Sequence, residues 1–196
     1  IHAMTASEIF DVPLDEMTPD IRRRAKAINF GLMYGKTAFG LSQELKIPMT
    51  EAREMISQYF KRYHAVKDFL DAQIEEAKEH GFVQTLGGRR RFLPDIKSKN
   101  PAIRNNAERM AMNTPIQGTA ADLIKLAMIR LDDRLRDGKF KSKVVIQVHD
   151  ELVFDVHKDE VEAIKALVHD KMVNAVSLSV PMEVEMGTGK NWLEAH

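Results

Sequence analysis

The sequence predicts an α/β protein of the α+β kind, with helices first and a mixture of helices and small antiparallel sheets after them. Two observations lead to this expectation. Apolar residues recur at helical spacing over much of residues 1–80, whereas glycines and short β-branched or aromatic runs appear within residues 82–196. With 196 residues, 44% hydrophobic and 30% charged, the chain can bury a core of ordinary size in one domain or two small lobes.

Helices account for the first part of the chain. The nearby Thr18-Pro19 pair makes Asp20 a suitable N-cap, so a helix is expected from about residue 20 to Gly35. A short helix should follow at 39–46. A longer one should run from Thr50 to about His80, where Gly81 ends it. Its buried stripe is expected to consist of Ile56, Tyr59, Phe60, Tyr63, Val66, Phe69 and Leu70.

Strands alternate with helices in the second part. Phe82–Leu86 and Arg91–Leu93 flank two glycines, a pattern typical of a β-hairpin. The remaining elements expected, in chain order, are a helix at 101–136 interrupted near Pro115 or Gly118, a β-hairpin at 143–157, a helix at 158–176 and a strand at 181–187.

The hairpin at 143–157 has two adjacent carboxylates, Asp150 and Glu151, at or beside its tight turn. Valine, isoleucine and phenylalanine surround them, and a carboxylate next to an apolar sheet is costly unless a positive charge compensates it. A hard divalent cation such as Mg²⁺ would do so, because it binds through carboxylates and substrate phosphates. Asp150 and Glu151 are therefore candidate metal ligands.

Composition excludes some classes of protein. The chain has no cysteine, so disulfides and thiolate metal sites are excluded. No apolar run approaches the roughly 18 residues of a membrane span, so no membrane partner is expected. The net charge is zero, yet residues 89–109 hold seven basic and two acidic residues, a net charge of +5, while acids gather at 150–170. This segregation suits a bound polyanion, and it equally suits solvated helix faces.

The segment from Arg22 to Tyr34 carries the most specific pattern. Arg22, Lys26, Phe30 and Tyr34 recur every four residues, so they form one slanted stripe on a helix, cationic at one end and aromatic at the other. A nucleotide has the same polarity, with phosphates at one end and the base at the other. Gly31 and Gly35 would let another body approach the helix backbone closely. The alternative is an ordinary amphipathic helix.

Longer motifs carry a resemblance to a known family. R-x-x-x-K-x-x-x-F-G-x-x-Y-G resembles the fingers-helix motif of family A DNA polymerases, bacterial members in particular. Four further segments resemble palm segments or the C-terminus of that family: TLGGRRRFLPDI (85–96), ERMAMNTPIQGTAADLIK (108–125), QVHDELVF (147–154) and MGTGKNWLEAH (186–196). The resemblance implies a fingers subdomain at 1–81 and the C-terminal part of an antiparallel-sheet palm at 82–196, with motif C in the hairpin at 143–157.

The resemblance also implies roles for single residues in template-directed nucleotidyl transfer from a dNTP to a primer 3′-hydroxyl. Asp150 takes the place of a catalytic aspartate that holds two Mg²⁺ ions, and Glu151 that of an auxiliary carboxylate. Arg22 and Lys26 would clamp the triphosphate, Lys26 in a catalytic role too, and His2 would add a phosphate contact. Phe30 would pack on the deoxyribose, and Tyr34 would gate the position of the templating base.

Primer–template DNA is the second implied partner. Residues implied to contact it are Arg89, Arg109, Asn113, Gln117 and His149. The family's first catalytic motif should lie before Ile1. We therefore expect this chain to need the remaining N-terminal part of the polymerase and to be inactive alone. The expected location is the bacterial cytoplasm, in association with the nucleoid.

Two other functions fit part of the sequence. One is a non-catalytic nucleic-acid-binding module built on the basic residues of 89–109. The other is a metal-dependent phosphohydrolase that uses His149 and Asp150, although such enzymes usually place this pair on helices with further histidine and aspartate ligands.

Overall fold

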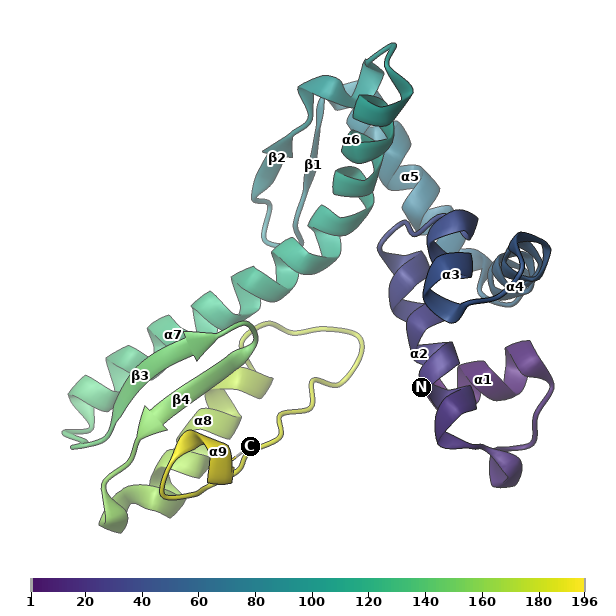
Figure 1. The fold of residues 1–196 in the computed structure, drawn as a ribbon. Helices are drawn as coiled ribbons and strands as arrows, with labels where there is room; N and C mark the ends of the chain where they lie inside the picture. The colour runs from purple at the N-terminus through teal and green to yellow at the C-terminus, as the bar shows by residue number, and fades with distance from the viewer. Residues whose placement is uncertain (1, 196) are drawn as a thin grey trace. The chain divides into compact units, whose positions relative to one another are not determined.

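Helices dominate the computed structural model, which describes residues 2–195, and two small antiparallel sheets follow residue 81 (Figure 1). This confirms the predicted α+β class. The chain divides into two compact units, Ile1–Ile116 and Gln117–His196. The division between fingers and palm after residue 81 is a functional boundary and stays a prediction. No helix among the described residues has the length and apolar character needed to cross a bilayer.

The first unit begins with four helices around one core. They are α1 (His2–Phe10), α2 (Pro19–Met33), α3 (Ala38–Leu45) and α4 (Met49–Arg62), with a 3₁₀ turn at Leu14–Glu16. The buried side chains that join them are Ile9, Ile28, Leu32, Leu41, Ala52, Met55 and Tyr59. This core holds α2 between its neighbours and leaves the other side of the helix for polar and aromatic side chains.

The ends of these helices differ in part from the predictions. Thr18, and not Asp20, caps α2: its Oγ1 accepts a hydrogen bond from the Ile21 N–H at 3.3 Å, and Pro19 occupies the first turn.

The prediction of a single helix at 50–80 is also wrong. The backbone breaks at Tyr63 (φ −109°, ψ 55°), where α4 ends and α5 (His64–His80) begins. The stripe therefore reaches this core only as far as Val66. Beyond the break Leu70 is buried, as predicted, whereas Phe69 is 40% exposed and the prediction for it is wrong.

A second cluster completes this unit. Gly81, at φ 77°, ends α5 as predicted. The strands β1 (Phe82–Gln84) and β2 (Arg90–Phe92) then pair antiparallel with Phe82 opposite Phe92, followed by a 3₁₀ turn (Pro94–Lys97) and α6 (Pro101–Asn113). Val83 points to the helices, so one face of the hairpin is buried. The side chains of this cluster are Ala77, Val83, Leu93, Ile96, Ala107 and Ala111.

A π-helical turn (Thr114–Gly118) follows α6, so the predicted interruption near Pro115 is confirmed. The second unit contains α7 (Thr119–Asp137), β3 (Lys143–Val148), β4 (Glu151–Asp155), a 3₁₀ turn (Lys158–Glu160), α8 (Val161–Val173) and α9 (Trp192–Ala195). One face of the β3–β4 hairpin packs on α7 and α8 through Val144, Leu152 and Phe154, against Leu131, Leu135, Ile164 and Val168.

The predicted strand at 181–187 is wrong. Its apolar and polar residues alternate, but no strand among the described residues pairs with it, and without a partner the alternation cannot form a ladder. The helix expected at 158–176 is shorter than predicted, because a 3₁₀ turn forms its first part and α8 ends at Val173.

Candidate functional site

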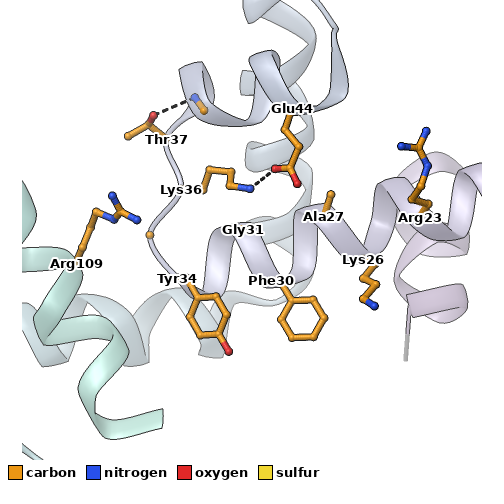
Figure 2. A pocket seen from close by; sticks show the side chains of 12 residues that line it. Arg23, Lys26, Ala27, Phe30, Gly31, Tyr34, Lys36, Thr37, Glu44 and Arg109 are labelled. Atoms are coloured by element: carbon orange, nitrogen blue, oxygen red, sulfur yellow. Dashed lines mark hydrogen bonds and ion pairs between the residues drawn. The ribbon is translucent and has the colours of Figure 1, made fainter. Parts of the chain in front are cut away.

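The predicted stripe on α2 is present as a cationic and aromatic surface. Lys26, Phe30 and Tyr34 project from the same side of the helix (Figure 2). The rings of Phe30 and Tyr34 stack at 6.2 Å with 24° between their planes, and Lys26 Nζ lies 5.9 Å from the centre of the Phe30 ring. The contacts order the side chains from a positive charge to two aromatic faces, the polarity expected of a nucleotide site.

A groove of about 670 Å³ lies beside this stripe. Its lining residues are Arg23, Lys26, Ala27, Phe30, Gly31, Tyr34, Gly35, Lys36, Thr37, Gly40, Glu44 and Arg109. The sequence patterns missed the contributions of Arg23, Lys36, Thr37 and Glu44. Arg22, predicted to clamp phosphates, is exposed on the first turns of α2 and does not line the groove.

The loop after α2 shapes one end of the groove. Lys36 donates its N–H to the Gly31 carbonyl at 2.7 Å, and its ammonium pairs with Glu44 on α3 (Figure 2). The Thr37 side chain caps α3 by accepting from the Gly40 N–H at 3.2 Å. These contacts hold the short connection between α2 and α3 in place. Lys36, Thr37 and Glu44, which make them, form one wall of the groove.

Gly35 brings α6 to the groove. Its φ of 71° lies in the left-handed region, and a Cβ at this position would lie 2.4 Å from Met112 Cε and 3.2 Å from Arg109 Cγ. The close approach predicted for Gly35 is therefore confirmed, and the approaching element is α6. As a result Arg109, predicted from the palm-like helix to contact DNA, points toward the end of α2 that carries Tyr34 (Figure 2).

His2, on α1, joins the aromatic part of the stripe. Its ring lies 5.5 Å from that of Phe30, and its Nδ1 lies 3.0 Å from Nδ2 of Asn29. Burial lowers the pKa of the His2 imidazole, and the positive charges of Lys26 and Arg22 lower this pKa further. These surroundings favour the neutral form of the His2 imidazole.

The second predicted site lies on the β3–β4 hairpin. Val148 pairs with Glu151, so His149 and Asp150 form a two-residue turn, as the sequence indicated. His149 has φ 53°, a conformation that is uncommon outside glycine and is found often at functional sites. Asp150 is exposed at this turn and Glu151, half-buried, begins β4. Both carboxylates therefore lie at the turn end of a two-stranded antiparallel element.

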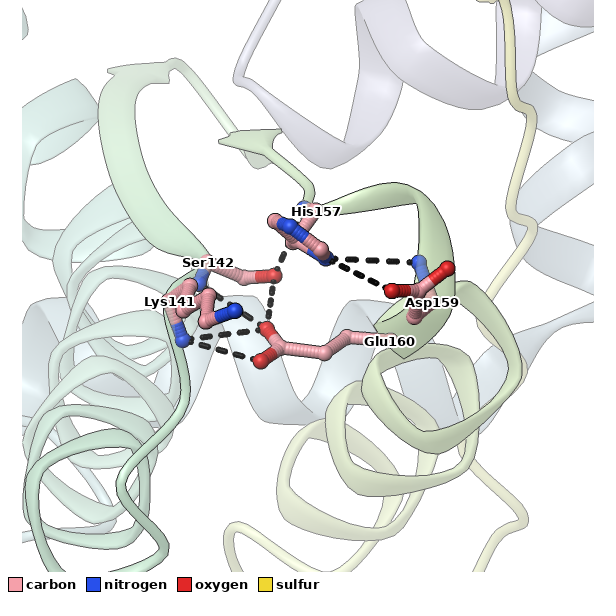
Figure 3. Close-up of polar contacts among 5 residues, drawn as sticks. All are labelled: Lys141, Ser142, His157, Asp159 and Glu160. Carbon is pink, nitrogen blue, oxygen red and sulfur yellow. Dashed lines mark hydrogen bonds and ion pairs between the residues drawn. The ribbon is translucent and has the colours of Figure 1, made fainter.

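A polar cluster around the buried Ser142 side chain joins the two ends of this hairpin (Figure 3). The Glu160 carboxylate accepts hydrogen bonds from the Lys141 N–H at 3.0 Å and from the Ser142 N–H and hydroxyl at 3.0 and 2.6 Å. Ser142 Oγ in turn accepts from the His157 N–H at 3.0 Å. These bonds lower the pKa of Glu160, the backbone N–H of Lys141 contributing most. They tie the start of β3 to the chain that follows β4.

Asp150 and Glu151 provide the hard oxygen ligands that Mg²⁺ prefers. Within residues 2–195 no group of three histidine, aspartate or glutamate side chains is close enough to hold a metal ion. The two carboxylates therefore fit part of a magnesium site, and a complete site needs further oxygen ligands from a substrate phosphate or from another carboxylate.

The residues predicted to contact DNA lie on several elements. Arg89 is exposed in the β1–β2 connection, where its N–H bonds to Thr85 Oγ1 at 3.2 Å. Arg109 and Asn113 are one helical turn apart on α6, and Gln117 lies in the π-helical turn that follows. His149 is in the carboxylate turn, where its carbonyl accepts from Gln147 Nε2 at 3.0 Å. Only Arg109 of this set lines the groove beside α2.

Comparison with known proteins decides the family, because residues 1–194 match the model of DNA polymerase family A. The chain belongs to this family. Relatives of DNA polymerase family A that resemble it include DNA polymerase I of Mycobacterium tuberculosis, 48% identical over 98% of this chain, and DNA polymerase I of Bacillus caldotenax, 49% identical over the whole of it. The chain spans 21% and 22% of these relatives, or about a fifth of their length.

A solved structure of the family has the same fold. The POL domain of Pol1 from M. smegmatis, described as a complex with DNA primer-template and dNTP, is 46% identical to this chain and superposes with a TM-score of 0.95. The match covers 99% of this chain and 34% of that one. The resemblance stated from the motifs thus extends over nearly all of the sequence and the fold.

Proposed function

We propose that this chain forms the fingers (1–81) and the C-terminal part of the palm (82–196) of a DNA-directed DNA polymerase. The reaction is transfer of a nucleotide from a dNTP to the 3′-hydroxyl of a primer, as directed by the template. The observation that carries the proposal is the groove beside α2, where a cation and two stacked aromatic rings line up in the polarity of a nucleotide. Membership in DNA polymerase family A supports it.

The nucleotide binds along α2 in this proposal. Lys26 and Arg22 neutralise the triphosphate, and His2 adds a hydrogen bond to a phosphate oxygen. The face of Phe30 packs on the deoxyribose, and Tyr34 lies where the templating base enters. Arg109, on α6, brings a further positive charge to the Tyr34 end, so the groove can contact both the nucleotide and the template strand.

The hairpin carboxylates provide the second half of the chemistry. Asp150, with Glu151 as an auxiliary ligand, would hold Mg²⁺, and phosphate oxygens would supply further ligands. Such ions activate a hydroxyl nucleophile and neutralise charge on the leaving group. The two-residue turn places the Asp150 carboxylate at the exposed end of the hairpin, where ions and phosphates can reach it.

DNA is bound by the basic residues of 89–109 and by donors farther along the chain. The proposed contacts are Arg89, Arg109, Asn113, Gln117 and His149. Amide and guanidinium donors suit phosphates and the acceptors of the minor groove, which all correct base pairs present in a similar way. The description of the M. smegmatis structure as a complex with primer-template and dNTP supports this choice of partners.

The remaining N-terminal part of a longer polymerase is the third proposed partner. The length of the relatives supports this, because this chain corresponds to about a fifth of them. We place the complete enzyme in replication and repair, in the bacterial cytoplasm near the nucleoid.

Replacing Asp150 tests the proposal in the complete polymerase. We expect Asp150→Asn to lower turnover roughly a thousand-fold, because a neutral amide no longer holds the ions, each factor of ten being about 1.4 kcal/mol of the barrier. Single-nucleotide incorporation on a primer–template measures the loss. Asp155→Asn, on the same hairpin, is the matched control and should retain activity.

Other outcomes identify the alternative functions. Full DNA affinity with no nucleotide incorporation by the wild-type protein would indicate a non-catalytic binding module. Phosphate release from nucleotides without primer extension, lost in Asp150→Asn, would indicate a phosphohydrolase.

A further inference from the structure

A chain of hydrogen bonds leads from the surface of the first unit to His2. The Asn29 Nδ2 group lies 3.0 Å from His2 Nδ1 and donates to Thr5 Oγ1, also at 3.0 Å. The Tyr63 hydroxyl lies 3.4 Å from Thr5 Oγ1 and donates to the Glu8 carboxylate. Arg62 Nη2 donates to Glu8 at 2.6 Å and closes the series. The series joins α1, α2 and the break between α4 and α5.

Thr5 holds the middle of this series in place. It is 2% exposed, so water cannot replace its partners easily, and its hydroxyl lies 3.4 Å from Asn29 Oδ1. Asn29 Nδ2 donates to Thr5 Oγ1, and Asn29 Oδ1 lies near the same hydroxyl, so both ends of the amide contact Thr5. The orientation of its amide is thereby set by α1, on which both His2 and Thr5 lie.

The Asn29 amide determines which nitrogen of His2 carries the proton. Because Nδ2 only donates, His2 Nδ1 must accept, and a neutral imidazole that accepts at Nδ1 carries its hydrogen on Nε2. Among residues 2–195 no hydrogen bond to Nε2 is present, so this N–H remains able to donate to a ligand. The same ring contacts Phe30 on the stripe of α2.

We propose that Asn29 is a positioning residue for nucleotide binding: it fixes His2 as the Nε2–H tautomer, which donates a hydrogen bond to a phosphate oxygen of the dNTP. This inference rests on the proposed function. His2 then differs in its task from Lys26 and Arg22. These two side chains contribute charge, whereas His2 contributes a directed donor whose orientation is set before the nucleotide arrives.

The tautomer can be measured without any activity. In the complete chain with ¹⁵N-labelled histidine rings, long-range ¹H–¹⁵N correlation spectra should show the Nε2–H tautomer at His2. In Asn29→Asp the carboxylate can only accept, so the proton should move to Nδ1. Asn29→Leu should lose the preference for Nε2–H. Asn105→Leu, an exposed asparagine on α6, is the matched control and should leave the His2 signals unchanged.

The consequence for nucleotide binding is measured in the complete polymerase. Asn29→Asp and Asn29→Leu should each raise the KM for dNTP about ten-fold, as expected for loss of a hydrogen bond to a charged group, with little change in kcat. Thr5→Val should act in the same direction, because Asn29 loses its second acceptor. Thr5→Ser retains the hydroxyl and should retain the wild-type KM.

The proposal is overturned if Asn29→Asp leaves the His2 tautomer unchanged, or if the tautomer changes while the KM for dNTP does not. A wild-type protein that incorporates no nucleotide would contradict the proposed function, and the spectra would still report on the tautomer. The two failures are therefore distinguishable.

Discussion

Individual side chains on α2 differ in how strongly the surrounding protein holds them. Phe30 and Tyr34 stack on each other, and Phe30 also contacts His2, so their positions are fixed by aromatic contacts. Lys26 is exposed, and its Nζ lies 5.9 Å from the centre of the Phe30 ring. A long, exposed cationic side chain can adjust to the phosphates it binds, whereas the rings form a preformed face for sugar and base.

We expect Lys26→Gln to weaken nucleotide binding. Loss of a charge-assisted hydrogen bond costs about 1.5–3 kcal/mol, which corresponds to a KM for dNTP roughly ten- to a hundred-fold higher. Primer extension at varied dNTP concentration in the complete polymerase gives this value. Lys61→Gln, on the exposed side of α4, changes the net charge equally and should have no effect; an equal effect would show that only long-range charge matters.

The connection between α2 and α3 depends on how closely α6 can approach Gly35. A side chain at this position is unfavourable for two reasons. The φ of Gly35 is positive, and a Cβ would lie 2.4 Å from the Met112 methyl group. Gly81 also has a positive φ, at 77°, but a Cβ there would meet nothing within 4 Å. The two glycines therefore separate backbone strain from the packing contact.

We expect Gly81→Ala to lower the free energy of unfolding by about 1 kcal/mol, the cost of a non-glycine residue in this region. Gly35→Ala should cost about 1 kcal/mol more, because Met112 must also move. Urea denaturation of both variants measures the difference. Equal losses would mean that the flexible Met112 side chain moves aside without cost, so that its contact with Gly35 adds nothing to stability.

The Glu160 cluster makes the stability of the β3–β4 hairpin depend on pH. Its hydrogen bonds favour the charged carboxylate and lower the Glu160 pKa below its ordinary value of 4.5. A depressed carboxylate pKa stabilises the folded state fully above the unfolded value, and this contribution is lost as the pH falls through the folded value.

Glu160→Gln should therefore be less stable than the wild-type protein at pH 7, and this difference should shrink as the pH falls below 4.5. Chemical denaturation at a series of pH values measures it. Glu162→Gln removes a carboxylate that is paired with Lys165 on the surface of α8, and it should show little loss at any pH. A difference that is constant with pH would contradict a role for the Glu160 charge.

Across the whole molecule, local patterns were predictable from the sequence and long-range contacts were not. Four-residue spacing was sufficient to predict the stripe on α2, and two apolar runs around a tight turn were sufficient to place Asp150. The break at Tyr63 could not be predicted, because that side chain bonds to Glu8, 55 residues earlier. The approach of Arg109 to Gly35 and the contact between Asn29 and His2 also join distant segments.

The strand expected at 181–187 was predicted from a local pattern but is absent from the described residues, because the long-range pairing that a strand needs is missing. Its alternation of apolar and polar residues is a local signal, but a strand also requires a partner that sequence periodicity does not supply. Helices contain their own hydrogen-bond partners. For this reason the helices agreed better with expectation than the last sheet element did.

The basic residues that gather at 89–109 should make the affinity of the protein for DNA depend on salt concentration. Residues 89–109 carry +5, and each cation that contacts a phosphate releases about one counterion when DNA binds. Arg89→Gln should therefore weaken binding for all sequences alike and reduce the slope of log K against log salt concentration by about one. Fluorescence anisotropy with a labelled primer–template at several salt concentrations measures this slope. Arg53 is exposed on α4, and Arg53→Gln makes the same change in net charge, so this control should leave the slope unchanged. Equal slopes for the wild-type protein, Arg89→Gln and Arg53→Gln would mean that Arg89 does not contact the DNA backbone.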